Sequence, residues 1–388
     1  MNICPPELCT GCGMCSNLCH QNAIKMTKDI HGFVYPKISS DKCTGCGLCT
    51  AKCPALREKK AGSTMKDIYA AFNKNKKTLK NSSSGGVFNL IANEIIKENG
   101  LVAGVRWNSD FCPEHSLASS FDEIKEFSGS KYAQSNTKRI YSEIKEALNS
   151  QKKVLFSGTP CQVAALKSFL GKEDNNLFTV DLVCHGVPSY EMLEKYLQQT
   201  AQGKKIKKVN LRHKSPYWDY CSVRIDFDDG SHYQKYTVDD SYFTLFNIGY
   251  SLRESCHSCK FTTTNREGDI TLADFWGYTP ASAKMRNYNR GISLIAVNTE
   301  KGAELFGKIK KDLNFEVKTY NSALRTNKSL SEPFTLPKEN LAAFWKDYEN
   351  GMTVNELCKN HVKTPFCIPN LLFLRRLKRK YGWMLKHK

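Results

Sequence analysis

Residues 152–184 read KKVLFSGTPCQVAALKSFLGKEDNNLFTVDLVC, and this stretch decides the fold. Two short apolar runs, typical of buried strands, flank a helical segment that opens on Thr159, a favoured N-cap residue, and Pro160. A strand, a helix and a second strand in close succession predict a parallel strand pair. Cys161 and Cys184 each follow one of these strands. Because parallel strands end at the same edge of a sheet, we expect the two cysteines to lie close together there.

The same alternation extends in both directions along the chain. It predicts strands at 67–72, 101–107, 269–277 and 291–297 and helices at 85–100, 137–150 and 188–199. Residues 206–238 do not follow this alternation, and their pattern predicts antiparallel strands with a DDGS turn. From about residue 299 the pattern is mainly helical. We therefore expect an α/β domain with a largely parallel, mixed sheet and a helical C-terminal extension.

The N-terminal region contains a repeated cysteine run. CTGCGMCSNLC (9–19) and CTGCGLCTAKC (43–53) both follow the spacing C-x2-C-x2-C-x3-C, with glycines that let the backbone wrap tightly. Four converging thiolates are what a [4Fe-4S] cluster needs, so the pattern predicts two clusters. A zinc site and a disulfide framework are the alternatives.

Residues 7–58 resemble bacterial-type two-[4Fe-4S] ferredoxins, which implies an α+β ferredoxin-like domain over residues 1–58. In such ferredoxins the fourth cysteine of each run binds the other cluster. The resemblance therefore assigns one cluster to Cys9, Cys12, Cys15 and Cys53, and the other to Cys43, Cys46, Cys49 and Cys19. His20 departs from the pattern, where proline is common, and Cys4 lies outside it as a spare thiol.

Composition limits the classes of function. The chain has 388 residues, 17 cysteines and a formal net charge of +19, which argues for two or three domains and for metal or redox use of the cysteines. We see no secretory signal and no apolar run long enough to cross a bilayer, so we expect a cytoplasmic protein. The negative charge of the clusters would offset part of the excess positive charge. The remaining positive charge suits an acidic redox partner, an anionic cofactor or a membrane surface. Nucleic acid is not expected, because no recognition motif accompanies the charge.

Five later segments resemble the coenzyme F-420 hydrogenase/dehydrogenase beta-subunit family. They are NSSSGGVF (81–88), GSKYAQS (129–135), SGTPCQVAALK (157–167), DLVCHGVPS (181–189) and CHSCKF to GDITLADFWG (256–277). The resemblance covers most of residues 67–300 and implies an α/β flavin-binding domain with FAD and a further [4Fe-4S] cluster. We divide this domain into 67–150 and 151–300, the latter holding the third cluster, and the extension is 301–388.

The later cysteines provide a ligand set for that third cluster. The helix start stabilises a thiolate at Cys161, Cys184 follows the next strand, and CHSC supplies Cys256 and Cys259 with iron–sulfur-like spacing. Buried structural thiols and a zinc half-site are the alternatives.

The Ser/Gly turn at residues 83–86 precedes a helix, and free amides there suit the FAD pyrophosphate. Our candidate contacts are Ser83, Ser84, Gly85 and Gly86, with Lys131 as a phosphate partner and Tyr132 as a stacking face. A simple helix cap and a solvated loop are the alternatives.

Three residues are candidates for proton transfer or for lining the flavin. His115 and His185 lie near the implied cofactor region and are candidate proton donors, although a hydrogen-bonded structural histidine is the alternative. Asp274, in GDITLADFWG, is a candidate for the flavin pocket. The C-terminal segment 371–388 reads as a basic amphipathic helix, which either contacts an anionic membrane surface peripherally or packs on the core.

The leading hypothesis is an iron–sulfur flavoprotein oxidoreductase that passes electrons between [4Fe-4S] clusters and FAD, and between FAD and a small redox substrate. Its partner would be a ferredoxin or a reductase- or hydrogenase-type subunit. The alternatives are an electron-transfer subunit without its own substrate and a protein of polysaccharide biosynthesis with structural clusters. No residue set establishes coenzyme F-420 binding, and no G-x-G-x-x-G fingerprint indicates nicotinamide binding.

Overall fold

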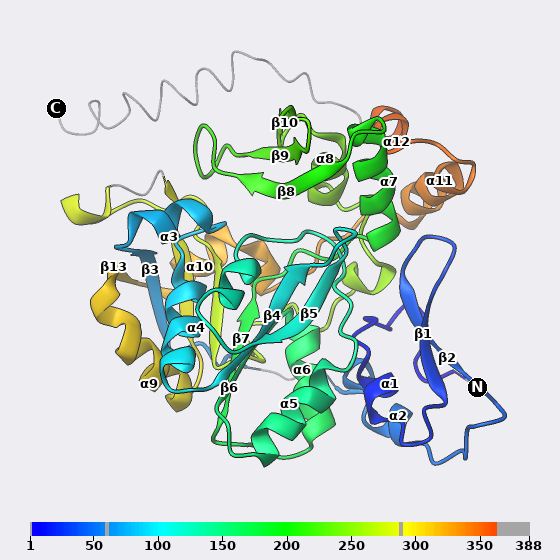
Figure 1. The fold of residues 1–388 in the computed structure, drawn as a ribbon, viewed down its shortest axis with the longest axis horizontal. Coiled ribbons are helices and arrows are strands. Elements are labelled where there is room, and N and C mark those ends of the chain that lie inside the picture. The colour runs from blue at the N-terminus through cyan, green and yellow to red at the C-terminus, as the bar shows by residue number, and fades with distance from the viewer. Residues whose placement is uncertain (1, 59–61, 287–289, 363–388) are drawn as a thin grey trace.

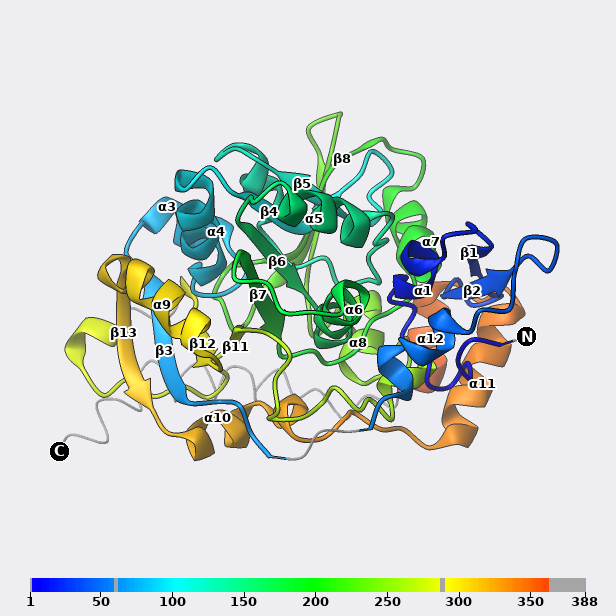
Figure 2. The same cartoon turned by 90° about the horizontal axis from the view of Figure 1, so that it is seen from below.

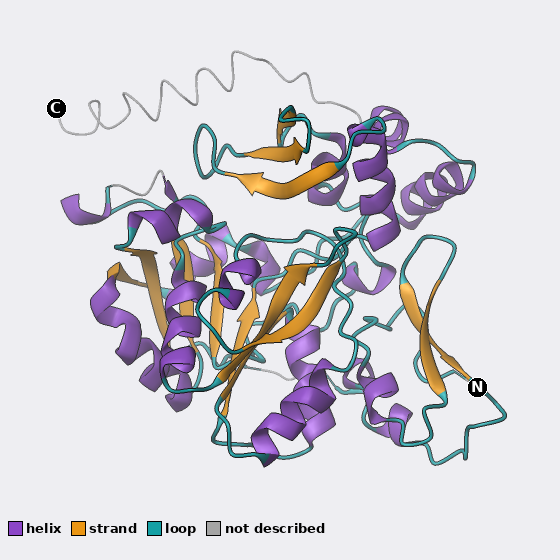
Figure 3. Ribbon diagram, viewed as in Figure 1, coloured by secondary structure: helices purple, strands orange, loops and turns teal. Residues whose placement is uncertain are grey.

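The computed structural model of the chain describes residues 2–58, 62–286 and 290–362. Figure 1 shows an N-terminal domain (residues 2–58), a body built around an eight-stranded sheet, and a layer around a three-stranded sheet. Figure 3 shows how helices cover the faces of the large sheet and flank the small one.

The N-terminal domain is a hairpin beside two short helices. Strands β1 (Ile24–Lys28) and β2 (Val34–Ile38) pair antiparallel. Helices α1 (Met14–Leu18) and α2 (Leu48–Ala51) each begin after a glycine in the left-handed region, Gly13 and Gly47. Helix and hairpin together give the expected α+β domain.

The large sheet has the strand order β13-β3-β12-β11-β7-β6-β4-β5. Its strands are β3 (Asp67–Asn73), β4 (Leu101–Trp107), β5 (Pro113–Ala118), β6 (Val154–Gly158), β7 (Leu177–Leu182), β11 (Ile270–Asp274), β12 (Ser293–Val297) and β13 (Leu313–Lys318). The neighbouring pairs β4–β6, β6–β7 and β7–β11 are parallel, and the other four neighbouring pairs are antiparallel. The prediction of a mixed sheet is confirmed, whereas the prediction of a largely parallel one is wrong.

Both faces of the large sheet are covered, which explains the continuous apolar runs of its central strands. Helices α4 (Val87–Lys97) and α9 (Glu300–Ile309) pack on one face, and α5 (Ile140–Asn149) and α6 (Pro160–Leu170) pack on the other. Side chains alternate between these cores along β6, where Leu155 faces the first and Phe156 the second. Helices α3 (Lys76–Asn81) and α10 (Tyr320–Thr326) lie beside β3.

The smaller layer confirms the antiparallel strands expected at 206–238. Strands β8 (Ile206–His213), β9 (Ser222–Phe227) and β10 (His232–Tyr236) form a meander. They share a core with helices α7 (Tyr190–Ala201), α8 (Ser241–Asn247), α11 (Lys338–Glu349) and α12 (Val354–His361).

Two strands of the large sheet are absent from the sequence-based prediction. Strand β5 pairs with β4 at one edge of the sheet, and β13 pairs with β3 at the other. The segment after residue 301 is therefore not purely helical, because β13 belongs to the sheet. The basic segment 371–388 lies outside the described residues, and no helix among the described ones is long and apolar enough to cross a membrane.

Candidate iron–sulfur and cofactor sites

The first cysteine group lies in the N-terminal domain. Cys9, Cys12, Cys15 and Cys53 line one cavity, so the fourth thiol comes from the second run, which is the grouping that the ferredoxin pattern predicts. Burial raises the pKa of the Cys12 thiol to about 11 and moves that of Cys15 above its usual range. Coordination to iron would take protons from these thiols, since the thiolate is the ligand. Four sulfurs around one enclosed space fit the donor set of a [4Fe-4S] cluster.

The second cysteine group lies nearer the surface. Cys46 is exposed, and Cys19, Cys43 and Cys49 are partly buried. Cys19 and Cys49 pack against a small apolar cluster that includes Ile24. This group therefore lies where another protein can approach it.

The glycines of the two cysteine runs also differ in how closely the rest of the protein surrounds them. Gly11, Gly13, Gly45 and Gly47 all have φ between +62° and +75°, a region that favours glycine. A Cβ on Gly13 would lie 2.3 Å from Thr137 Oγ1 in the body, whereas a Cβ on Gly47 would meet nothing within 4 Å. The first run is thus pressed against the body, and the second is open.

The third cysteine group lies at the carboxyl edge of the parallel strands. Cys161, Cys184, Cys256 and Cys259 line a single cavity. Strands β6 and β7 pair in parallel, and the cysteines that follow them meet as expected. Thr159 and Gln162 form a capping box that fixes the start of α6. Burial, followed by the nearby Cys259, raises the pKa of Cys184 to about 12 and that of Cys161 well above its usual range.

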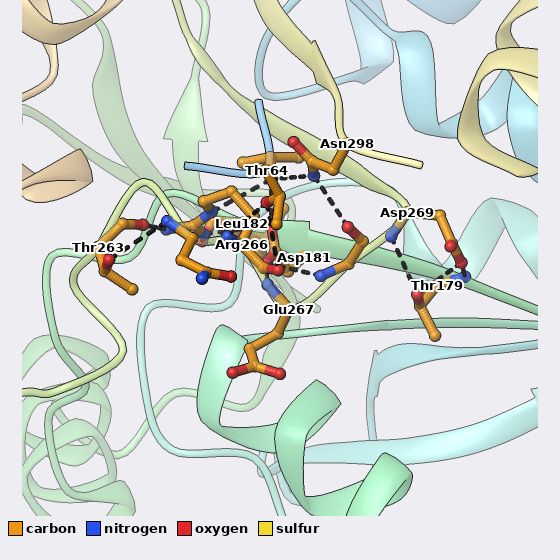
Figure 4. A network of polar contacts seen from close by, with 12 residues as sticks. Thr64, Thr179, Asp181, Leu182, Thr263, Arg266, Glu267, Asp269 and Asn298 are labelled. Atoms are coloured by element: carbon orange, nitrogen blue, oxygen red, sulfur yellow. Dashed lines mark hydrogen bonds and ion pairs between the residues drawn. The ribbon is translucent and has the colours of Figure 1, made fainter. Parts of the chain in front are cut away.

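A buried ion pair holds the segments that carry two of these cysteines (Figure 4). Arg266 lies 3.1 Å from Asp181, and both side chains are almost completely buried. Arg266 also donates to the carbonyl of Leu182, while Asp181 accepts from the backbone amides of Glu267 and Gly268, each at 3.0 Å. The pair thereby ties the end of β7, just before Cys184, to the loop that follows Cys259.

In residues 2–58, 62–286 and 290–362, no three His, Cys, Asp or Glu side chains gather tightly enough to hold a single metal ion. The cysteine groups are therefore wider than a site for one ion. The sixteen described cysteines, twelve in the three groups and four outside them, are all free thiols.

The first and third groups adjoin one another across the domain interface. Thr10 lines both cavities. Gln134 donates to the carbonyls of Thr10 and Gly11 at 3.3 and 3.2 Å, and the hydroxyl of Tyr141 donates to the carbonyl of Cys12 at 2.9 Å. Figure 2 shows the N-terminal domain beside α6, the helix that begins at the third group.

Arg253 crosses this interface as a fully buried cation. Its guanidinium donates to the carbonyls of Cys9 at 2.6 Å and Val34 at 3.0 Å, and to the side-chain oxygen of Gln134 at 3.1 Å. It also lies 4.1 Å from the ring centroid of Tyr35. Among the described residues no carboxylate lies within ion-pair distance of it, so its charge is compensated there by carbonyl and amide oxygens and the Tyr35 ring.

The two segments expected to bind FAD come together. Gly86 caps α4 in the left-handed region, and the backbone amide of Ser130 donates to Ser83 Oγ at 2.7 Å. Ser84 donates to the carbonyl of Ile292 at 2.9 Å. Lys131 differs from the expectation of a free phosphate partner, because its ammonium donates to the carbonyls of Glu126 and Ser128 and burial lowers its pKa to about 7.

Tyr132 and Asp274 meet around Arg212. The Arg212 guanidinium donates to the hydroxyl of Tyr132 at 3.3 Å and pairs with Asp274, which also accepts from the indole of Trp218 at 3.0 Å. Trp276 stacks on Trp218 and lies over the same guanidinium. One terminal nitrogen of this buried arginine has no partner within the described part of the chain.

The two histidines occupy other environments. His115 is buried in β5, shares a hydrogen bond of 3.2 Å with Ser135, stacks on Phe156, and has its pKa lowered to about 4 by burial. His185 lines the third cavity, with its ring nitrogen 3.1 Å from the carbonyl of Phe246. His115, His185 and Asp274 therefore have different contact partners, and no hydrogen bond or ring contact joins any two of these three described residues.

The residues that join these sites do not stand out in the sequence. No motif marks Arg253, Arg266 or Arg212, and Cys4 lines the first cavity although it falls outside the repeated run. The available signal is position, since Arg253 comes three residues before Cys256 and Thr10 lies between Cys9 and Cys12.

The fold and the cysteine groups define an α/β protein of the iron–sulfur electron-transfer class. Residues 8–56 match the model of the 4Fe-4S dicluster domain, and residues 151–323 match that of the C terminus of the coenzyme F420 hydrogenase/dehydrogenase beta subunit. The chain thus carries an N-terminal dicluster domain and a later segment similar to the C terminus of this beta subunit. The two matches together support an iron–sulfur protein of the oxidoreductase type.

Among solved structures, the chain is similar to one in a xenon-derivatised F420-reducing [NiFe] hydrogenase complex from Methanosarcina barkeri. The two are 19% identical with a TM-score of 0.47, and the match covers 76% of this chain and 93% of the other. No curated protein matches the sequence.

Proposed function

We propose that this protein is an iron–sulfur flavoprotein oxidoreductase with three [4Fe-4S] clusters and FAD. The observation that carries the proposal is the meeting of Cys161, Cys184, Cys256 and Cys259 in one cavity that shares Thr10 with the first cysteine cavity. Two adjoining cavities, each lined by at least the four thiols that a cluster needs, favour electron transfer between them, because electrons need closely spaced centres.

The second cysteine group would be the outermost centre, since Cys46 is exposed. The first group would hold the middle centre and the third group the inner one. The clusters supply one-electron steps, and FAD supplies the exchange of electron pairs with a small redox substrate. Electrons could flow along the three clusters in either direction, so the substrate acts either as the electron acceptor or as the electron donor.

The chain's own residues have distinct tasks in this scheme. The Asp181–Arg266 pair positions the loops of the third group, and Arg253 places a positive charge beside the first. The α4 start with Ser83 and Ser130 suits a pyrophosphate, and the free Arg212 nitrogen beside Trp276 suits an anionic ring system. These features support FAD at the junction of the large sheet and the smaller layer.

Anaerobic purification with counts of iron, sulfide and flavin tests the proposal. We expect about twelve irons and one FAD per chain, and about eight irons in the Cys161→Ala variant. The matched control is Cys221→Ala, a buried cysteine of the smaller layer that lines neither cavity. Eight irons in the unaltered protein, or an unchanged count in Cys161→Ala, would refute the third cluster.

A second function follows from the exposed second group. The chain would then be an electron-transfer subunit, with a partner protein docking near Cys46 and no substrate of its own. FAD reduction by a partner protein alone, and by no small donor, distinguishes this function from the first.

A further inference from the structure

Cys4 lies outside the repeated cysteine pattern but inside the first cavity. It is 7% exposed and lines that cavity together with Cys9, Cys12, Cys15 and Cys53. It packs in one small cluster with Cys9 and Cys53. Burial, followed by the nearby Cys53 and Cys9, raises the pKa of the Cys4 thiol to about 12. Five thiols therefore share a space in which a [4Fe-4S] cluster uses four.

The local chain fixes Cys4 in this place. Residues 4–9 read CPPELC, and the two prolines restrict the backbone between the cysteines. The backbone amide of Cys9 donates to the carbonyls of Pro5 at 2.9 Å and Pro6 at 3.2 Å, which closes a tight turn. Ile3, the residue before Cys4, is only 4% exposed, so its buried side chain also anchors this segment. Cys4 is thus held against the site and is not a loose terminal thiol.

The second cysteine group has no such extra thiol. Apart from the eight cysteines of the two runs, no cysteine of the described residues packs in the apolar cluster around Cys19 and Cys49. Cys19 and Cys53 hold the same position, the fourth cysteine, in their respective runs. Only Cys53 packs beside a cysteine that belongs to neither run.

We propose that Cys4 is an alternate ligand of the first cluster that replaces Cys53. This inference rests on the proposed assignment of the first cluster to Cys9, Cys12, Cys15 and Cys53. In the exchange an iron–sulfur bond to Cys53 breaks, one to Cys4 forms, and the thiol proton of Cys4 passes to Cys53. No electron is transferred and no co-reactant is needed. The exchange keeps the cluster bound when Cys53 dissociates.

Iron counts on four variants of the full chain test the proposal. We expect Cys53→Ala to keep the iron content of the unaltered protein with a changed EPR spectrum, because Cys4 takes the vacated position. The Cys4→Ala/Cys53→Ala double variant should lose about four irons, and so should the matched control Cys19→Ala. Cys4→Ala alone should keep them all.

Equal iron loss in Cys53→Ala and the double variant would overturn the proposal, as would an insoluble Cys53→Ala chain beside a soluble Cys19→Ala chain. A second measurement uses only Cys4→Ala, a conservative change. Its first cluster should be lost to an iron chelator several-fold faster than that of the unaltered protein, and equal rates would also overturn the proposal. The iron count of the unaltered protein tests the proposed function separately, because fewer than eight irons would contradict the cluster assignment itself.

Discussion

Removal of the Arg253 charge should lower the reduction potential of the first cluster. The guanidinium lies 2.6 Å from the carbonyl oxygen of Cys9, and a cysteine carbonyl lies only a few ångströms from its own sulfur. The separation between this cation and the nearest thiolate is therefore about 7 Å or less. At that distance and an effective dielectric constant of ~20, one unit charge contributes about 2 kcal/mol. For a one-electron couple this corresponds to roughly 100 mV.

The sign follows from the charge that the cluster gains. Reduction adds a negative charge, which a neighbouring cation stabilises, so Arg253→Met should shift the potential downward by roughly 100 mV. Arg253→Lys keeps the charge but loses the forked donor geometry, so it should shift the potential much less. Both variants lose hydrogen bonds across the interface, and only the first loses the charge.

An EPR-monitored redox titration of the anaerobically purified protein measures the shift. Arg224→Met serves as the control, since Arg224 is partly exposed in β9 and already pairs with Asp226. Equal potentials in Arg253→Met and Arg253→Lys, with the iron content unchanged, would show that the buried charge does not act on the cluster.

Three further predictions concern stability. Asp181→Asn leaves Arg266 buried without its counter-charge and should destabilise the fold by about 3–5 kcal/mol in urea unfolding, whereas a loss below ~1 kcal/mol would mean that the pair is solvated. Gly13→Ala should lower the melting temperature more than Gly47→Ala, because both need positive φ but only Gly13 is crowded; equal shifts would contradict the docked interface. His115 has a folded pKa of about 4, below its unfolded value, so it contributes stability above pH 6.5 that is lost as the pH falls. The free energy of unfolding should fall by about 2 kcal/mol more between pH 7 and pH 5 in the unaltered protein than in His115→Gln. An equal fall in both proteins would refute this prediction.

Local patterns in the sequence determined most of the elements and the grouping of the cysteines. The strand, helix and strand at 152–184 place Cys161 and Cys184 at one edge, because parallel strands share a direction and apolar runs of that length are buried. The repeated runs likewise predicted that Cys53 would join Cys9, Cys12 and Cys15. The edge strand β13 is the exception: LNFEVK at 313–318 alternates apolar and polar residues as a half-buried strand does, but it follows a helical stretch and is absorbed into the mainly helical interpretation of this region.

Only the tertiary structure decided which residues serve these groups. The sequence by itself determined that cysteines at fixed spacing would converge, because short loops limit where their thiols can go. It did not determine that Arg253 would reach Cys9, 244 residues away along the chain, or that Cys4 would join a cavity closed by Cys53. Such contacts depend on how separate elements pack, and packing of the dicluster domain against α6 is a long-range property that no local pattern encodes.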